Sequence, residues 1–325
     1  MRSVFGNNLI ISLFGESHSN YIGFTLHGLP SGIEIDDEFI KSELNRRRPS
    51  NKLNTSRIEE DNYNIISGVF EGFTTGSPLT VLIENKKQDS SSFEKGVCRP
   101  GQSDYTSFIA SNGYNDYRSG GHLSGRLTVA LVFLGAICKR ILDKHNIKIT
   151  SKILKKIEDK DNDTTGGLVE VKASGVIAGI GEPFFDSMES VLSHLFFSIP
   201  SVKAVEFGLG KEFANVYGSE CLDEMEIKNG KVKFLNNYNG GINGGFTNGE
   251  EIVSTITFKP IASINKEVNT INILKQENIK YRNNGQNDAN ILNRSLVICE
   301  AMMAYGLLDE MISYLGRKNL WLKLV

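Results

Sequence analysis

The stretch SGRLTVALVFLGAICKRI, residues 124–141, decides the fold. Its apolar residues recur at helical spacing, and from Val129 to Cys138 it is apolar nearly all round. A helix of this kind must be covered on most of its sides, so we expect it at the centre of the molecule. Ser124 stands where an N-cap is expected.

Three more helices are predicted around this one. Arg294 to Leu315 and Met188 to Ser198 show the same apolar periodicity. The third follows a capping Asp36, has acidic residues in its first turn and extends to Arg48. Its apolar stripe is modest, so its polar side should face solvent or a ligand.

Short strand-like stretches alternate with these helices. They are separated by glycine turns rather than by regular βα units. This favours an α+β fold, with buried helices and sheets outside them, over a doubly wound sheet. The predicted strands are Leu9 to Phe14, Tyr21 to Leu26, Asn64 to Phe70, Leu79 to Glu84, Leu168 to Gly175, Val202 to Gly208 and Glu251 to Phe258.

Polar stretches of the chain are predicted to be loops. Lys155 to Gly167 is typical of a surface excursion, and Asn236 to Asn248 and Asn269 to Asn290 are typical of turns. Apolar strands resume directly after the first of these stretches, so it does not mark a domain boundary. Residues 1–325 are therefore expected to form one domain.

The composition excludes several classes of function. With 325 residues and 40% hydrophobic content, the chain is expected to be globular. Its formal net charge of -2 gives no overall excess of positive charge for binding nucleic acid or anionic lipid. Its longest apolar run, Val129 to Cys138, is too short to span a membrane. The cysteines lie far apart and suit neither a zinc site nor a disulfide framework. We therefore expect reduced thiols in a cytoplasmic protein without a metal.

Two constellations near the start of the chain can carry chemistry. His18, in FGESH after the first long strand, is a candidate general acid because an imidazole exchanges a proton near neutral pH. A turn histidine bonded to backbone is the alternative. The run Arg46 to Pro49, followed by Lys52 and Arg57, can bind carboxylates and phosphates. The same run can also simply compensate a helix dipole.

Two further constellations precede long helices. In RSGGHLSGR, from Arg118 to Arg126, glycines let backbone N–H groups approach a phosphate at a helix N-terminus, although an ordinary glycine turn fits as well. In GQND, from Gly285 to Asp288, the aspartate can act as a base or cap the last helix. Together the four constellations describe a site for a polyanionic ligand with proton-transfer groups.

The order and the sequences of these motifs resemble those of the chorismate synthase family along nearly the whole chain. The matching text is FGESH at 14–18, GLPSGIEID at 28–36, RRRPS at 46–50, SGVFEGFTTGSPLTVLIEN at 67–85, RPG and DYT within 99–106, DYRSGGHLSGRLT at 116–128, GIGEPFFD at 179–186, SIPSVKAVEFG at 198–208, GSE at 218–220, GGINGG at 240–245 and FKPIASI at 258–264. The resemblance implies the family's fold, a layered β/α/α/β sandwich in which buried central helices are flanked by mostly antiparallel sheets.

The resemblance also implies an activity. Family members eliminate phosphate from 5-enolpyruvylshikimate-3-phosphate to give chorismate, and they use reduced FMN without net redox change. It further implies a homotetramer that acts on a small molecule and binds neither nucleic acid nor membrane. NADPH enters as an indirect reductant of the flavin in bifunctional members.

Position by position, the resemblance implies three sets of site residues. Flavin contacts fall on His122, Leu123, Ser124, Pro200, Ser201, Gly244, Lys259, Pro260, Ile261, Ala262, Ser263 and Gln286. Substrate anions are expected at Arg47, Arg48, Lys52, Arg57 and Arg126, although Arg47 and Lys52 match positions that the family assigns to nicotinamide nucleotide. In catalysis, His18 would protonate the leaving phosphate and Asp288 would assist removal of the ring hydrogen.

The sequence departs from the family at three of these positions. Gln102 stands where the family has a catalytic histidine, and Gln286-Asn287 stands where it has Arg-His. Glutamine and asparagine form hydrogen bonds but carry neither the proton nor the fixed charge. A rival hypothesis is therefore a catalytically impaired homologue that retains only flavin or partner binding. A third is a flavin reductase that uses nicotinamide nucleotide.

Overall fold

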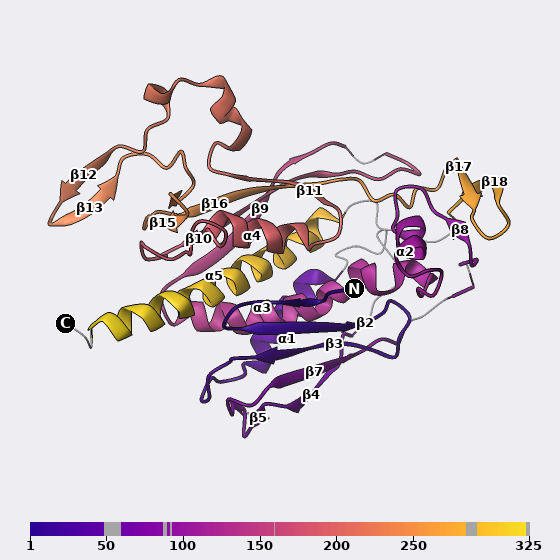
Figure 1. The fold of residues 1–325 in the computed structure, drawn as a ribbon, viewed down its shortest axis with the longest axis horizontal. Coiled ribbons are helices and arrows are strands. Elements are labelled where there is room, and N and C mark those ends of the chain that lie inside the picture. The colour runs from indigo at the N-terminus through magenta and orange to yellow at the C-terminus, as the bar shows by residue number, and fades with distance from the viewer. Residues whose placement is uncertain (49–59, 87–89, 92, 159, 284–290, 323–325) are drawn as a thin grey trace.

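Two antiparallel sheets enclose the long helices (Figure 1). The computed structural model describes residues 1–48, 60–86, 90–91, 93–158, 160–283 and 291–322. The layers follow the order sheet, helices, sheet, which confirms the predicted α+β architecture with its helices inside.

The first sheet has the strand order β1-β2-β3-β7-β4 and lies beneath the helices in Figure 1. Its inner face is apolar because alternate residues of a strand face the same way: Leu79, Val81 and Ile83 of β7 are buried, and the residues between them only partly so. The strands are β1 Val4–Phe5, β2 Ile10–Gly15, β3 Tyr21–His27, β7 Leu79–Glu84 and β4 Tyr63–Ser67.

The second sheet has the order β11-β16-β10-β9 and covers the helices from the other side. Its strands are β11 Val202–Phe207, β16 Ile252–Phe258, β10 Gly167–Ser174 and β9 Lys148–Lys156. Strand β9 was not predicted, because inward Ile149 and Ile153 are interspersed with exposed lysines. The surface excursion predicted from Lys155 is therefore wrong at its first two residues, which still belong to β9.

Four helices fill the space between the sheets: α1 Asp37–Arg47, α3 Thr128–Asp143, α4 Met188–Phe197 and α5 Leu292–Leu322. Helices α3 and α5 are the central pair, and nearly every residue of α3 from Val129 to Cys138 is buried, as predicted. They cross so closely that a Cβ added at Gly135 would lie 2.1 Å from the Cβ of Ala301. The absence of a side chain at Gly135 therefore sets the distance between the two helices.

The helix starts largely follow the predicted caps. The Asp36 carboxylate accepts the N–H of Phe39 at 2.9 Å and caps α1. Ser124 caps a short 3₁₀ turn, η2 (Gly125–Leu127), and α3 begins directly after it at Thr128. Helix α5 begins before the predicted Arg294 and continues beyond Leu315.

The remaining elements are shorter and lie outside the two main sheets and their four helices. They are β5 Val69–Phe70, β6 Phe73–Thr74, β8 Val97–Cys98, α2 Asp104–Ala110, the 3₁₀ helices η1 Arg118–Leu123, η3 Gly210–Asn215 and η4 Gly218–Glu220, the hairpins β12 Met225–Lys228 with β13 Lys231–Phe234 and β14 Ile242–Asn243 with β15 Phe246–Thr247, and β17 Glu267–Asn272 with β18 Glu277–Arg282.

The loop predicted from Asn269 to Asn290 is wrong over its first part. Strands β17 and β18 form a hairpin there, and β8 pairs with β17 at Cys98 and Val97. The hairpin is polar, so its apolar pattern is weak, and backbone pairing with a distant strand decides its conformation. Residues 284–290 lie outside the described residues.

All four cysteines are free thiols, as expected. Within the described ranges, no helix is both long and apolar enough to cross a bilayer. The same residues contain no group of three His, Cys, Asp or Glu side chains placed to hold a metal ion.

Candidate active site

His18 lies in the turn between β2 and β3 and is only 4% exposed. Its ring packs edge-on against Phe93, with the ring centroids 5.6 Å apart. The backbone N–H of Ser17 donates to the carbonyl of Gly121 at 3.0 Å. The histidine turn is therefore fixed to the glycine-rich loop that the sequence singled out.

An ionised carboxylate lies close to His18. Burial would raise the pKa of Asp116, but hydrogen bonds from Arg118 and the charge of His18 hold that pKa below its ordinary value. The Arg118 guanidinium donates to both carboxylate oxygens, at 2.8 and 2.9 Å. Asp116 therefore places a negative charge near the histidine turn.

The glycine-rich loop has a backbone that ordinary residues rarely adopt. Gly120 and Gly121 have φ values of 82° and 54°, and Ser119 between Arg118 and Gly120 has φ 50°. A Cβ added at Gly121 would lie 2.4 Å from the carbonyl oxygen of Asp116. Only glycine therefore fits this position, and the carbonyl of Gly121 is thereby presented to the histidine turn.

The ring of His122 joins three segments of the chain. Its Nδ1 lies 2.7 Å from the carbonyl oxygen of Gly15, and its Nε2 lies 2.6 Å from Oγ of Ser3. A carbonyl only accepts, so Nδ1 carries the proton and Nε2 accepts the serine hydroxyl in the neutral ring. Both ring nitrogens thus hold the loop against β2 and the residue that precedes β1.

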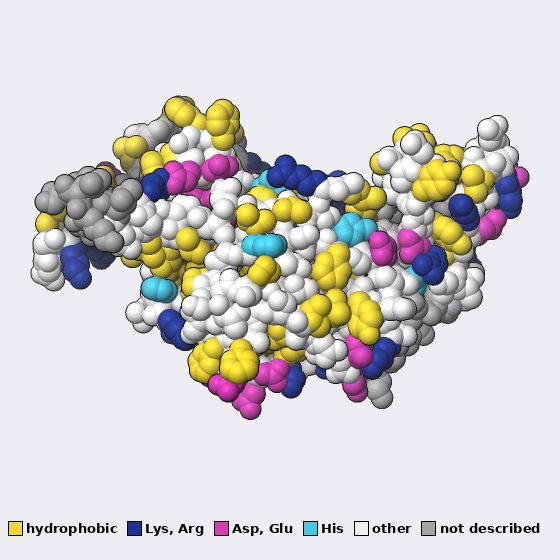
Figure 2. Space-filling view, turned by 60° about the horizontal axis from the view of Figure 1, so that its bottom comes forward, with side chains coloured by type: hydrophobic (Ala, Val, Ile, Leu, Met, Phe, Trp, Pro, Cys, Tyr) yellow, Lys and Arg dark blue, Asp and Glu magenta, His cyan; other side chains and the backbone are white. Residues whose placement is uncertain are grey.

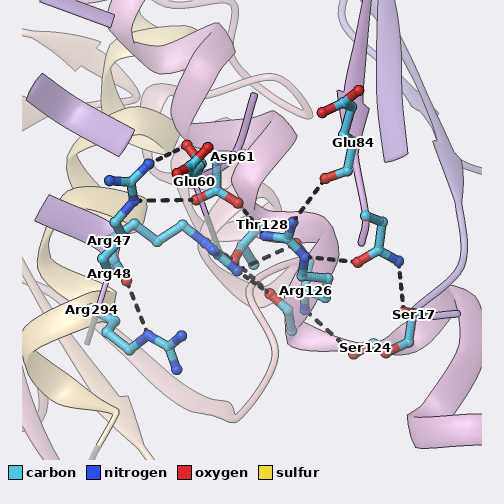
Figure 3. Close-up of polar contacts among 12 residues, drawn as sticks. Ser17, Arg47, Arg48, Glu60, Asp61, Glu84, Ser124, Arg126, Thr128 and Arg294 are labelled. Carbon is cyan, nitrogen blue, oxygen red and sulfur yellow. Dashed lines mark hydrogen bonds and ion pairs between the residues drawn. The ribbon is translucent and has the colours of Figure 1, made fainter. Parts of the chain in front are cut away.

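Four arginines gather beside this loop: Arg47, Arg48, Arg126 and Arg294, called here the arginine group (Figure 3). Arg47 is 6% exposed and donates from Nε to Oγ1 of Thr128 at 3.0 Å. Its own carbonyl accepts Nε of Arg294 at 3.0 Å. Helix α1 therefore ends against the starts of α3 and α5.

Two acidic residues, Glu60 and Asp61, lie among these arginines (Figure 3). Arg126 binds the buried Asp61 carboxylate at 2.5 Å, and Nε of Arg48 lies 4.0 Å from the same carboxylate. Among the described residues, four guanidinium groups lie together with these two carboxylates. Such a site suits a ligand with several negative charges.

Arg126 also connects this group with the histidine turn. Its Nε donates to Oδ1 of Asn85 at 3.3 Å, and Nδ2 of Asn85 donates to the carbonyl of Ser17 at 2.8 Å. The residue before His18 and the arginine group therefore belong to one hydrogen-bonded network (Figure 3).

A second set of the residues implied by resemblance meets around the loop after β8. Nε2 of Gln102 donates to Oγ of Ser263 at 2.8 Å, and Nζ of Lys259 donates to the carbonyl of Gly101 at 2.7 Å. The N–H of Lys259 donates to the carbonyl of Ser201 at 2.9 Å. Segments 200–201 and 259–263 are thus held to this loop, with Pro200 and Pro260 to Ala262 lying within them.

This loop is also connected to His18, through Arg99 and Phe93. Asp104 accepts hydrogen bonds from Nε and the terminal nitrogen of Arg99 at 2.7 and 2.8 Å. The Arg99 guanidinium lies 5.2 Å from the centre of the Phe93 ring, the ring on which His18 packs. Phe93 therefore contacts both His18 and Arg99 of the loop that carries Gln102.

One of the residues implied by resemblance lies apart from the rest. Gly244 is in the turn between β14 and β15, next to the start of α4, where the N–H of Met188 donates to the carbonyl of Gly245. Strand β15 is near the opposite end of the long axis from β8 and α2 (Figure 1). Within one chain, Gly244 does not join the other site residues.

Figure 2 shows a face of the molecule that is hollowed between two raised ends, with histidine and cationic side chains along the hollow. Leu123 is 44% exposed, whereas Ser124 uses its hydroxyl to cap η2. Lys52, Arg57, Gln286 and Asp288 lie outside the described residues.

Sequence reasoning missed several residues that build the site. They are Ser3, Asp61, Asn85, Phe93, Arg99, Asp104, Asp116 and Arg294. Asn85, Arg99, Asp104 and Asp116 lie within motifs that resemble the family, so the sequence held a signal for them. The other residues carry no such signal in the sequence, because each acts through a partner elsewhere in the chain.

Comparison with known proteins settles the family. The family model for chorismate synthase matches residues 9–159 and 152–312. The chain belongs to the chorismate synthase family. It is 38% identical to the chorismate synthase of Thermococcus gammatolerans, over 97% of this chain and 98% of that one. It is 39% identical to the chorismate synthase of Chitinophaga pinensis, over 95% and 96% of the two chains.

A solved chorismate synthase has the same fold. Its crystal structure superposes with a TM-score of 0.74 at 25% identity, over 96% of this chain and 94% of that one. Membership of the chorismate synthase family makes this chain a carbon–oxygen lyase acting on phosphates.

Proposed function

We propose that this lyase removes phosphate from 5-enolpyruvylshikimate-3-phosphate by anti-1,4-elimination and releases chorismate, using reduced FMN without net redox change. The observation that supports this most directly is the network from the His18 turn through Asn85 to Arg126. It joins a buried proton-transfer residue to a group of arginines suited to a polyanionic ligand.

The reaction balances without an external oxidant or reductant. The C–O bond to phosphate breaks and its electron pair leaves with the phosphate, a ring C–H bond gives up its proton, and a new C=C bond forms. When bound, reduced flavin supplies transient electron density to the electron-poor ring and takes it back.

The residues of this chain bind, shield and move protons. His18 donates a proton to the departing phosphate from a buried position, where neighbouring Asp116 is ionised. Arg47, Arg48 and Arg126 offset the charges of two carboxylates and one phosphate. By analogy with the family, Asp288 assists removal of the ring hydrogen.

Three described segments support flavin binding. A Cβ added at Gly125 would meet nothing within 4 Å, so space is open beside the glycine-rich loop. Lys259 and Ser263 supply an ammonium and a hydroxyl next to Gln102. We assign flavin contacts to residues 122–124, 200–201 and 259–263, with Gln286 completing them. The ring of His122 already binds Ser3 and Gly15, so its backbone rather than its imidazole is free to face the flavin.

A homotetramer is proposed for two reasons. Gly244 is remote from the other flavin residues in one chain and needs a neighbouring subunit to contribute to a shared site. Phe184 and Phe185, close to it in the loop before α4, are 93% and 92% exposed, as is typical of side chains buried by assembly. Light scattering should give about four times the chain mass of 36.0 kDa.

Three minor assignments complete the proposal. NADPH acts only as an indirect reductant of the flavin, since Arg47 is buried against Thr128 and better suited to the wall of a substrate site than to a nucleotide. The free thiols suit a cytoplasmic enzyme. Residues 1–325 act as one domain.

The competing function is a homologue that binds flavin without turnover. The contact of Gln102 with Ser263 favours it, because an amide cannot exchange the proton that a histidine there would carry. The test is anaerobic incubation of the protein with pre-reduced FMN and the phosphorylated substrate. Chorismate formation is expected; folded, flavin-bound protein that forms none would establish the competing function.

A further inference from the structure

A largely buried cluster of charged side chains lies next to the arginine group, with Arg46 at its partly exposed edge. Arg46 binds both oxygens of Glu300, at 2.6 and 2.7 Å, and also Glu43 at 2.8 Å. Lys139 contacts both carboxylates, and the hydroxyl of Ser151 donates to Glu300 at 2.6 Å. These residues, called here the ionic cluster, come from α1, α3, α5 and β9, so one cluster joins three helices and a sheet.

The two carboxylates and Lys139 are withdrawn from water, whereas the Arg46 side chain is 43% exposed. The side chains of Glu300 and Glu43 are 3% and 6% exposed. Burial would raise the pKa of Glu300, but hydrogen bonds from Arg46 and Lys139 hold it below its ordinary value. Two cations face two carboxylates, so the cluster is neutral as a whole and depends on every member being present.

Replacing a buried ionic cluster by apolar residues is often neutral for stability. An ionic cluster, unlike an apolar contact, fixes the relative orientation of its side chains. It does so because the two N–H groups of a guanidinium align with the two oxygens of a carboxylate. Here that alignment fixes the last turn of α1 at Arg46, and the next two residues are Arg47 and Arg48 of the arginine group.

Resting on the function proposed above, we propose that Glu300 is a positioning residue that acts through Arg46 to place Arg47 and Arg48 for the substrate's anionic groups. Arg47 contacts the start of α3 because it lies at the end of α1. Its Nε donates to Oγ1 of Thr128 at 3.0 Å, and a terminal nitrogen donates to the carbonyl of Gly125 at 3.2 Å. A turn of α1 released from Glu300 shifts these contacts together. Glu300 itself touches neither substrate nor flavin.

The test compares Glu300→Gln with the wild type. The amide keeps the shape of the side chain but loses the charge that aligns Arg46. We expect KM for the phosphorylated substrate to rise at least about tenfold, with kcat within about threefold and the affinity for reduced FMN unchanged. Glu251→Gln, which disrupts the Lys172 ion pair on the second sheet, is the matched control and should leave KM unchanged.

Arg46→Lys is the second variant, because it retains the charge and the fold but cannot align with the carboxylate in this way. It should raise KM in the same direction. If folded Glu300→Gln and Arg46→Lys both show wild-type KM, even with a lower midpoint of thermal unfolding, the cluster serves stability alone and the positioning role is refuted.

Hydrogen exchange separates this outcome from failure of the proposed function. Residues 44–48 should exchange faster in Glu300→Gln, while the α5 amides around residue 300 keep wild-type protection. This readout needs no turnover, so it tests the positioning role even in an inactive wild type. Unchanged exchange at residues 44–48 in both variants overturns the inference; wild-type protein without turnover overturns only the proposed function.

Discussion

Replacing Glu310 with glutamine should stabilise the protein at high pH and not at low pH. Glu310 lies on α5 and is 1% exposed. Burial raises its pKa to about 7, and the negative charges of Asp309, Glu182 and Asp186 add to this. Arg317 faces the same region but binds Glu182.

The sign follows from proton binding. The folded protein keeps a proton on Glu310 up to about pH 7, whereas the unfolded chain loses it near 4.5. The folded state therefore loses stability as pH rises from 4.5 to about 7, and the loss is complete above that. The difference between the two pKa values corresponds to at most about 3 kcal/mol. Glutamine is neutral throughout and avoids this loss.

Urea unfolding followed by far-UV circular dichroism measures the effect. At about pH 5 the variant and the wild type should have nearly equal free energies of unfolding, and at about pH 8 the variant should be more stable by roughly 1–3 kcal/mol. Glu226→Gln, at an exposed position on β12, corrects for the loss of one negative charge. An advantage of the same size at both pH values, or one that appears only at low pH, would refute the reasoning.

The remaining predictions concern the acid, the helix contact and the departures from the family. His18→Ala should lower kcat by roughly 10²–10⁴ with little change in stability, and a variant that unfolds while keeping its specific activity would make His18 a structural residue. Gly135→Ala should cost about 1–3 kcal/mol in urea unfolding, because its Cβ would lie 2.1 Å from Ala301, whereas Gly316→Ala meets nothing within 4 Å and should be neutral or stabilising. Gln102→His, Gln286→Arg and Asn287→His together should raise initial chorismate formation more than the single changes predict, and a folded triple variant no faster than wild type would remove these positions from the active site.

The central helices and most strands of the two sheets were predictable because their pattern is local. The apolar run of α3 and the alternation in β7 require burial wherever they are placed, and Asp36 caps α1 within its own turn. The hairpin β17–β18 was missed because polar strands are held by pairing with a distant partner such as β8.

The candidate site could be located from the sequence but not assembled. His18 and Arg126 are visible as residue types, but their connection through Asn85 depends on three segments meeting in space. His122 shows the same limit: the resemblance implied a flavin contact there, and the structure commits both ring nitrogens to Ser3 and Gly15. The ionic cluster had no signal at all, since charged residues on a helix face ordinarily indicate solvent.

The most direct test of the central claim is the stoichiometry of one anaerobic reaction. The protein is mixed with pre-reduced FMN and 5-enolpyruvylshikimate-3-phosphate, and phosphate, chorismate and the redox state of the flavin are measured together. The account predicts equal amounts of phosphate and chorismate, flavin that is still reduced at the end, and no product when oxidised flavin is used instead. Phosphate released without chorismate, or flavin oxidised in step with product, would contradict it.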